Sequence, residues 1–348
     1  MFGPPRPGAR SGGAAKGGAE ARVVDPQATP DLGAVALLAR RVRAAVERVI
    51  VGKPEVIDQA LVAILCEGHI LIEDVPGIGK TKLAKALARS LGCTFKRLQC
   101  TPDLLPSDIT GLEFFNQRTQ TFEFRPGPVF TQILLTDEIN RATPRTQSAL
   151  LESMEERQVT VEGQTRALPR PFVVLATQNP VELQGTFPLP EAQLDRFLIR
   201  LALGYPSAAD EQEILKRYQT DEPLDDLQPV AGPEDILAMQ RAVRAVYTSP
   251  AVEAYVVAIA RATRAHPEVE LGLSPRGTLA LRRTAQALAA IREQTFVLPD
   301  DVKATAPAVL GHRLSISSGA RLRDRTAVEV VDEVLRSVPA PVEREARP

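Results

Sequence analysis

Hydrophobic positions along the chain follow two patterns, and the change from one to the other comes near residue 205. Up to that point, short apolar runs alternate with segments in which apolar residues recur at helical spacing. The apolar runs predict strands at 69–73, 95–98, 133–136, 172–176 and 197–203. The helical spacing predicts helices at 54–66, 80–91 and 144–156. Alternation of this kind predicts an α/β fold, with a parallel sheet covered by helices on both faces.

The two ends of the chain depart from this alternation. Residues 1–30 are rich in Gly, Ala, Pro and Arg, so we expect a disordered tail, and residues 32–50 predict an amphipathic helix. Beyond residue 206 the strand signals stop, and helices are predicted at 208–219, 233–247, 250–265, 275–291, 299–311 and 326–337. We therefore predict a tail at 1–30, an α/β core at 31–205 and an all-helical domain at 206–340.

Residues 74–81 join the strand predicted at 69–73 to the helix predicted at 80–91, and they read Asp-Val-Pro-Gly-Ile-Gly-Lys-Thr. This is a phosphate loop, G-x-x-x-x-G-K-[ST], except that Asp74 stands where the strict pattern has Gly. Backbone N–H groups and the helix dipole would hold phosphate oxygens there. Lys80 would reach the β- and γ-phosphates, and the Thr81 hydroxyl would hold Mg²⁺. The alternative is a Gly-rich turn, but the flanking strand and helix favour a nucleoside triphosphate site.

Two more predicted strands end in polar side chains. The strand at 133–136 is followed by Asp137 and Glu138, which is typical of the second half of a P-loop ATPase. Asp137 would hold Mg²⁺ through water, and Glu138 would polarise the attacking water. An ordinary strand ending in an acidic turn is the alternative. After the strand at 172–176, the Asn179 amide could orient the same water, although Asn-Pro is also a common turn signal.

Two predicted β-hairpins interrupt the alternation of strands and helices. One joins 112–115 to 121–124, and the other joins 158–162 to 165–168 through a turn containing Gly163. Neither hairpin is needed to hold a nucleotide. They therefore either serve recognition or mechanical work, or decorate the surface.

Composition limits the class of protein. The chain has 348 residues, 44% of them hydrophobic and 24% charged, which fits a globular protein of two domains. Its net charge is −1 and it has no basic block, which argues against a nucleic-acid partner. The cysteines show no disulfide or metal-ligand spacing. No apolar run is long enough to span a membrane, and no signal peptide is evident, so we expect a cytoplasmic protein.

The chain resembles the MoxR family of AAA+ ATPases over residues 34–340. The resemblance rests on blocks at 51–53, 73–81, 101–111, 137–142, 176–180, 189–197 and 273–276, in family order. It implies a three-layer αβα P-loop core with a parallel sheet and a C-terminal all-helical lid domain. It also implies a ring of identical subunits, most often a hexamer, and a hairpin that interrupts the second core helix. The family tolerates an acid at the position of Asp74.

The same resemblance implies roles for single residues. Asn179 matches sensor 1, and Arg276, in the first turn of a helix, matches sensor 2, whose charge could touch the γ-phosphate. Arg196 matches the arginine finger, which acts in trans on the nucleotide of a neighbouring subunit. Val51 and Gly52 match the segment that wraps the adenine.

The predicted site follows from the motifs and the resemblance together. Alternatives for Arg196 remain: it could be a solvated partner of Asp195 or Glu191, and Arg200 and Arg141 are rival fingers. The catalytic residues predicted are Glu138, Asn179, Arg196 and Arg276, and the Mg²⁺ ligands are Thr81 and Asp137. The residues predicted to bind ATP are Val51, Gly52, Val75, Pro76, Gly77, Ile78, Gly79, Lys80 and Thr81.

For function, the resemblance implies chaperone-like remodelling or activation of partner proteins, often ones with von Willebrand factor A domains. One alternative is a cofactor-insertion motor like the ATPase subunit of magnesium chelatase. Another is a binding scaffold timed by slow hydrolysis. A DNA translocase is disfavoured because no basic stripe is present. The sequence does not separate the first three.

Overall fold

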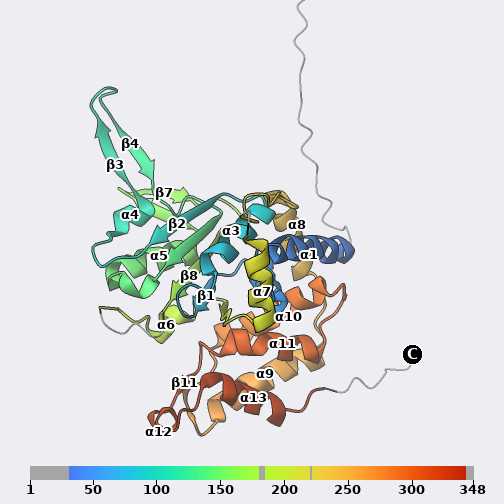
Figure 1. The fold of residues 1–348 in the computed structure, drawn as a ribbon. Coiled ribbons are helices and arrows are strands. Elements are labelled where there is room, and N and C mark those ends of the chain that lie inside the picture. Colours follow the sequence, from blue (N-terminus) through green and yellow to red (C-terminus); the bar gives the residue numbers. More distant parts are fainter. Residues whose placement is uncertain (1–30, 180–184, 220–221, 342–348) are drawn as a thin grey trace, which may run out of the picture.

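The computed structural model describes residues 31–179, 185–219 and 222–341, so the tail predicted at 1–30 lies outside the described residues. Within these ranges, a parallel sheet has the strand order β2-β5-β8-β1-β9 (Figure 1). Its strands are β1 (Ile70–Glu73), β2 (Phe95–Gln99), β5 (Ile133–Asp137), β8 (Val173–Gln178) and β9 (Ile199–Leu201). The predicted strands are therefore confirmed, although β9 is shorter than the predicted 197–203.

Alternate residues of the strands enter two separate hydrophobic clusters, one on each face of the sheet. Ile70 and Ile72 pack with α1 (Leu32–Glu47), α2 (Pro54–Leu65) and α3 (Lys80–Ser90). Leu71, between them, faces the opposite cluster with α4 (Pro106–Thr110) and α5 (Pro144–Glu156). Because side chains alternate along a strand, apolar residues at every position require cover on both faces. The three-layer αβα core is thereby confirmed.

The C-terminal part is mainly helical, and most of its helices begin at a capping side chain or a proline. Its helices are α7 (Ala208–Arg217), α8 (Pro233–Arg244), α9 (Pro250–Ala265), α10 (Pro275–Ile291), α11 (Pro299–Leu310), α12 (Ser318–Arg321) and α13 (Ala327–Ser337). Ser207, Ser249 and Ser274 each accept a hydrogen bond from a backbone N–H in the first turn. Residues of α8, α10 and α11 belong to the same hydrophobic cluster as β1. Packing is thus continuous across the change of pattern at residue 206.

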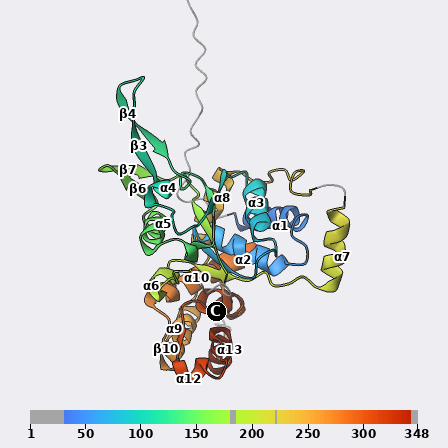
Figure 2. The ribbon, with the colours of Figure 1, turned by 60° about the vertical axis from the view of Figure 1, so that its left-hand side comes forward.

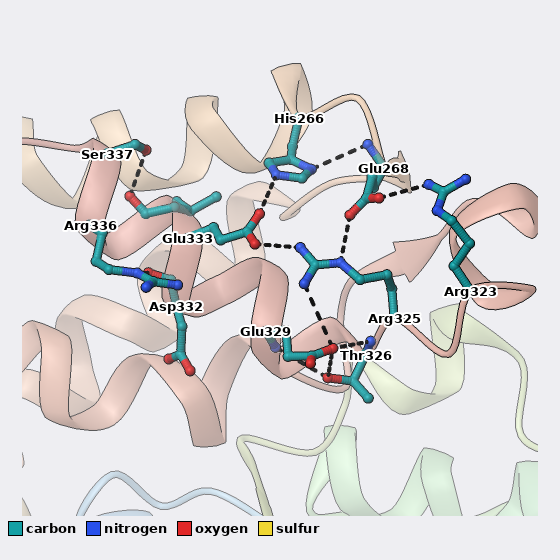
Figure 3. Close-up of polar contacts among 11 residues, drawn as sticks. His266, Glu268, Arg323, Arg325, Thr326, Glu329, Asp332, Glu333, Arg336 and Ser337 are labelled. Carbon is teal, nitrogen blue, oxygen red and sulfur yellow. Dashed lines mark hydrogen bonds and ion pairs between the residues drawn. The ribbon is translucent and has the colours of Figure 1, made fainter.

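One part of the all-helical prediction is corrected. β10 (Val269–Leu271) pairs antiparallel with β11 (Ser315–Ile316). Strands this short leave no alternating pattern in a sequence. Figure 3 shows how charged groups fasten this region to α13: Arg325 donates to Glu268, just before β10, and to Glu333 on α13. The same Glu268 also accepts from Arg323 at 2.8 Å.

Both predicted hairpins are present, and one projects from the body of the molecule. β3 (Gly111–Asn116) pairs with β4 (Thr121–Pro126), and β6 (Gln158–Val161) pairs with β7 (Gln164–Ala167). Figures 1 and 2 both show β3–β4 extending away from the sheet, with β6–β7 near its base. Arg166 joins the two hairpins, since it pairs with Glu113 at 2.9 Å and lies 4.1 Å over the Phe124 ring.

Candidate nucleotide-binding site

The phosphate loop connects buried strand β1 to helix α3, which begins at Lys80. Gly77 has φ +84° and Gly79 has φ +97°, a left-handed conformation that strains other residues. A Cβ atom built at either glycine would meet nothing within 4 Å. The backbone conformation, rather than crowding, is therefore the reason for glycine at both positions. The loop ends at the N-terminus of α3, where the first N–H groups have no partner within the helix.

Asp74, the departure from the strict loop pattern, anchors the loop. Its Oδ1 accepts from the N–H of Val75 at 2.9 Å, and its Oδ2 accepts from the N–H of Gly204 at 2.7 Å. Its carbonyl oxygen accepts from the Nζ of Lys80 at 2.7 Å. Burial lowers the pKa of Lys80, and nearby carboxylates, that of Asp74 first, oppose this shift. The acid thus ties the phosphate loop to the segment after β9.

Asp137 and Glu138 lie at the carboxyl end of β5, beside the loop after β1. Asp137 Oδ2 accepts from Arg97 Nε at 2.6 Å, and its Oδ1 accepts from the Thr177 hydroxyl at 3.1 Å. Glu138 is left-handed, with φ +55°. Its Oε2 accepts from Gln99 Nε2 at 2.9 Å. Both carboxylates are therefore oriented by side chains of neighbouring strands.

A cavity of about 770 Å³ lies beside the phosphate loop, a size typical of ligand pockets. Its charged end includes Lys80, Thr81 and Asp137. Its other wall includes Val49, Ile50, Val51 and Leu203, together with Ile214 and Leu215 of α7 and Tyr218 directly after that helix. A cavity with one charged and one apolar end suits the phosphates and the base of a nucleotide.

Most of the residues predicted to contact the nucleotide line this cavity. They are Val51, Pro76, Gly77, Ile78, Gly79, Lys80, Thr81 and Asp137. Gly52 and Val75 are not among the lining residues. Gly52 instead allows close packing, because a Cβ there would lie 2.3 Å from the Asp210 side chain at the start of α7. Asn179 directly follows β8, at the edge of the sheet where Asp137 and Glu138 lie.

Tyr218 is a residue of the cavity that the sequence did not indicate. Its hydroxyl donates to the carbonyl oxygen of Val49 at 3.0 Å, and Lys82 Nζ lies 3.8 Å over its ring. No local motif surrounds it, since it follows an ordinary amphipathic helix. Arg97 and Gln99 were also missed. Arg97 and Gln99 are two residues apart on β2, which indicates that their side chains share a face of the sheet. That spacing does not say that β5, with Asp137 at its end, lies beside β2.

Arg196 and Arg276 both contact Glu155, and neither lines the phosphate-loop cavity. Arg196 Nε lies 3.1 Å from Glu155 Oε2, and Arg276 Nη2 lies 2.6 Å from Glu155 Oε1. Arg196 lines a separate cavity of about 240 Å³, next to α5 and α6 (Glu191–Leu194). In Figure 2, α5 and α6 lie on the opposite side of the molecule from α7.

The alternatives for the arginine finger also have definite partners. The ion-pair partner of Arg196 is Glu155 rather than Asp195 or Glu191, and Asp195 pairs with Arg313 instead. Arg141 Nη1 donates to Glu138 of its own chain at 3.2 Å. Arg200 Nη1 donates to Glu73 at 2.8 Å.

Comparison with known proteins agrees with this geometry. Residues 69–199 match the model of the ATPase family associated with various cellular activities, and residues 261–334 match an AAA lid domain. The chain is 41% identical over 306 residues to the chaperone MoxR1 of Mycobacterium tuberculosis, covering 85% of this chain and 80% of that one. The chain belongs to the MoxR family of AAA+ ATPases. Both the fold class and the family resemblance seen in the sequence are thereby confirmed.

Two further relatives extend over most of this MoxR-family chain. The uncharacterised YeaC protein of Bacillus subtilis is 49% identical over 301 residues, covering 86% of this chain and 94% of the relative. The solved structure of a candidate ATPase from Cytophaga hutchinsonii superposes with a TM-score of 0.83 at 36% identity, covering 89% of this chain and 98% of that one. Among the described helices, none is both long and apolar enough to cross a membrane.

Proposed function

We propose that the chain binds and hydrolyses ATP with Mg²⁺, and that hydrolysis drives chaperone-like remodelling or activation of partner proteins. The observation that carries the proposal is the meeting of Lys80, Thr81 and Asp137 around one cavity whose far wall is mainly apolar. The phosphate loop and α3 supply N–H groups and a positive helix end for the phosphates. Membership of the MoxR family supports ATPase activity as a class, and the relative named as a chaperone supports the proposed use of it.

The donor set at the charged end fits Mg²⁺. Thr81 offers a hydroxyl and Asp137 a carboxylate, both hard oxygen ligands. Mg²⁺ is commonly held by one or two protein groups, waters and substrate phosphates rather than by a full protein cage. When bound, Mg²⁺ would neutralise charge on the phosphate oxygens.

Glu138 is the proposed general base. Gln99 and Arg141 both donate to its Oε2, so this carboxylate is held in one orientation at the edge of the sheet. A carboxylate at that edge can accept a proton from water that attacks the γ-phosphate. Asn179 follows the adjacent strand β8 and is the proposed second contact to that water.

Arg196 and Arg276 are proposed to act on the nucleotide of a neighbouring subunit. Their shared contact with Glu155 lies outside the phosphate-loop cavity of their own chain, which supports a trans role for both. The rival Arg141 donates to the proposed base, Glu138, of its own chain, and the rival Arg200 donates to Glu73 at the end of β1. We therefore propose a ring of identical subunits, a hexamer, in which each site is completed by the next chain.

The proposed partner is a protein client, of which von Willebrand factor A domain proteins are the first candidates, and the proposed location is the cytoplasm. The projecting hairpin β3–β4 supports a protein client. Phe115 and Phe122 lie edge to face across it at 5.3 Å, and Phe122 is 72% exposed. Exposed aromatic side chains on a protruding element suit apolar peptide segments.

We also propose that the chain is organised as a tail at 1–30, an ATPase core at 31–205 and a lid domain at 206–340.

The proposal is tested by the substitution Glu138→Gln, with phosphate release and ATP affinity measured separately. An amide keeps the shape of the acid but cannot take a proton, so turnover should fall by about 10²–10⁴-fold while ATP still binds. The matched control is Glu162→Gln, an exposed glutamate in the β6–β7 turn that is also left-handed. Unchanged turnover in Glu138→Gln would remove Glu138 from the role of base.

A further inference from the structure

Asp195 directly precedes Arg196 and joins two distant parts of the chain through one carboxylate. Its Oδ1 accepts from Arg313 Nε at 2.8 Å, and its Oδ2 accepts from the Ser274 hydroxyl at 3.1 Å. Asp195 follows the short helix α6, whereas Ser274 precedes α10 and Arg313 follows α11. One side chain therefore fixes the core segment that carries Arg196 against two segments of the helical part.

The Ser274 contact fixes the helix turn that carries Arg276. Ser274 is the N-cap of α10, and its Oγ also accepts from the N–H of Gly277 at 3.1 Å. The hydroxyl thus donates to Asp195 while it caps the helix. Arg276 is the second residue of α10, so its position depends on where this first turn is held.

The Arg313 contact fixes the backbone that follows Arg196. The Arg313 side chain is only 3% exposed, and its Nη1 donates to the carbonyl oxygen of Leu198 at 2.9 Å. It also donates to the carbonyl oxygen of Phe197. A guanidinium buried to this extent needs a charged partner, and Asp195 supplies it. The residues on both sides of Arg196 are therefore held by the same ion pair.

With these segments held in place, the side chains of Arg196 and Arg276 both form ion pairs with Glu155. Arg196 and Arg276 are far apart in the sequence, yet Arg196 Nε contacts Oε2 of that carboxylate and Arg276 Nη2 contacts its Oε1. Two guanidinium groups directed at one anion form a unit suited to a phosphate group.

We propose that Asp195 is a positioning residue that holds Arg196 and Arg276 together as one trans-acting pair. This inference rests on the proposed function, in which both arginines act on the ATP of a neighbouring subunit. Asp195 does not touch that ATP. It sets the relative position of the two arginines through Ser274 and Arg313, so losing its contacts lowers the rate of hydrolysis without weakening the binding of ATP to the same chain.

The main test is Ser274→Ala, because it removes the bridging hydroxyl and leaves the Asp195–Arg313 ion pair intact. Its matched control is Ser249→Ala. Ser249 is the N-cap of α9 and, like Ser274, directly precedes a proline; its Oγ accepts from the N–H of Val252. Among the described residues, no contact joins Ser249 to Asp195. Both variants lose an N-cap of the helical part, so any loss of stability is similar.

We expect Ser274→Ala to lower kcat about tenfold relative to Ser249→Ala. The reason is the loss of one hydrogen bond, from the Ser274 hydroxyl to Asp195, that holds Arg276 in position beside Arg196. KM and the Kd for ATP stay unchanged. Asp195→Asn lowers kcat by about 10²-fold, since small misplacements of catalytic groups have effects of this size. Ser274→Thr, which keeps the hydroxyl and the cap, restores kcat.

A second readout asks whether the defect acts in trans. Ser274→Ala and Glu138→Gln chains, carrying different affinity tags, are co-expressed, and rings that contain both are isolated by two purification steps. A Ser274→Ala chain then has an intact base and meets well-placed arginines from its Glu138→Gln neighbour. Turnover in these rings should exceed the average of the two parent rings.

The outcomes separate this inference from the proposed function. If Arg196→Ala is inactive but Ser274→Ala has the kcat of Ser249→Ala, the positioning role is refuted and the proposed function stands. No gain in the mixed rings also refutes it, since the defect then lies within the same chain. If Arg196→Ala hydrolyses ATP at the parent rate, the trans role fails and this inference fails with it.

Discussion

The phosphate-loop cavity contains the residues predicted to bind ATP, whereas the Glu155 cluster contains the two arginines proposed to act in hydrolysis, and the two sites are built differently. The cavity gathers Lys80, Thr81 and Asp137 of a single chain around a space large enough for a nucleotide. At the cluster, Arg196 and Arg276 converge on one carboxylate, and the cavity that Arg196 lines there has a volume of about 240 Å³. The residues predicted to bind the triphosphate therefore line a cavity of their own chain, whereas the two arginines proposed to act in hydrolysis lie outside that cavity.

This contrast separates binding from hydrolysis. A single chain brings together the groups predicted to bind ATP, because Asp137 ends β5 and the phosphate loop follows β1 in the same parallel sheet, with only β8 between them. It does not bring its predicted finger to that site. Hydrolysis therefore should depend on contact between chains, and a monomer should bind ATP without turning it over.

The largest expected effect comes from Arg196→Ala. An arginine supplied in trans stabilises the loose transition state of phosphoryl transfer and is worth about 10³–10⁵-fold in kcat. We expect this loss in a phosphate-release assay, with ATP affinity by calorimetry close to that of the parent.

Mixing the variant with Glu138→Gln separates a trans from a cis role. In a mixed ring, a nucleotide held by an Arg196→Ala chain meets an intact base in its own chain and an intact arginine from its Glu138→Gln neighbour. Some activity should return that neither variant has alone. Rings shown to contain both chains, yet inactive at every ratio, would mean that the finger is Arg200 or Arg141.

A smaller effect, on binding alone, is expected from Lys80→Ala. The substitution removes the charge-assisted contact that the Lys80 ammonium group is proposed to make with the phosphates. The Kd for ATP should therefore rise by about 10–10²-fold. The control is Lys85→Ala, an exposed lysine on the same helix α3. Equal ATP affinity in Lys80→Ala and Lys85→Ala, measured by calorimetry, would contradict the assignment of the phosphate loop.

The cavity and the cluster were not equally predictable from the sequence. The phosphate loop and the strand before Asp137 are local patterns, so their positions could be read directly, and the helices predicted at 250–265 and 275–291 match α9 and α10 to the residue. The strand order could not be read, because pairing joins segments far apart in the chain. For that reason Arg97 and Gln99, on the strand beside β5, were missed as partners of the two acids.

The cluster depends almost entirely on long-range packing. Matching to the family gave roles for Arg196 and Arg276, but nothing local says that they meet at Glu155. Asp195 was weighed only as an alternative partner for Arg196, whereas the fold gives it to Arg313 and Ser274. Tyr218 was missed for the same reason, since the wall of the cavity that it forms comes from beyond the predicted core.

The smallest expected effect concerns the frame that both regions share, and it depends on His69. His69 Nδ1 accepts from the N–H of Val174 in β8, and its Nε2 donates to the carbonyl oxygen of Met154, next to Glu155, each at 3.0 Å. This buried imidazole joins the middle of the sheet to the end of α5, and it can make both contacts only when neutral. Burial lowers its pKa to about 4.

The direction of the pH effect follows from that shift. Above about pH 6.5, His69 is neutral in both the folded and the unfolded chain and has no effect. As the pH falls toward 4, the unfolded chain takes up the proton more readily, so the free energy of unfolding decreases. Between pH 7 and pH 5 the loss from His69 should be about 2 kcal/mol. His312, also buried with a lowered pKa and in contact with the carbonyl oxygen of Phe197, adds to the loss in the same direction.

Urea unfolding at the two pH values, in the parent and in His69→Gln, isolates the contribution of His69. The amide cannot titrate in this range, so the variant should lose about 2 kcal/mol less between pH 7 and pH 5, even though it starts less stable. The loss of unfolding free energy that is due to His312 should remain in the variant. If both proteins lost the same free energy, His69 would not be the neutral link between the sheet and α5. The loss from His312 would then remain, and it should act on the segment that carries Arg196, because His312 Nε2 contacts the carbonyl oxygen of Phe197.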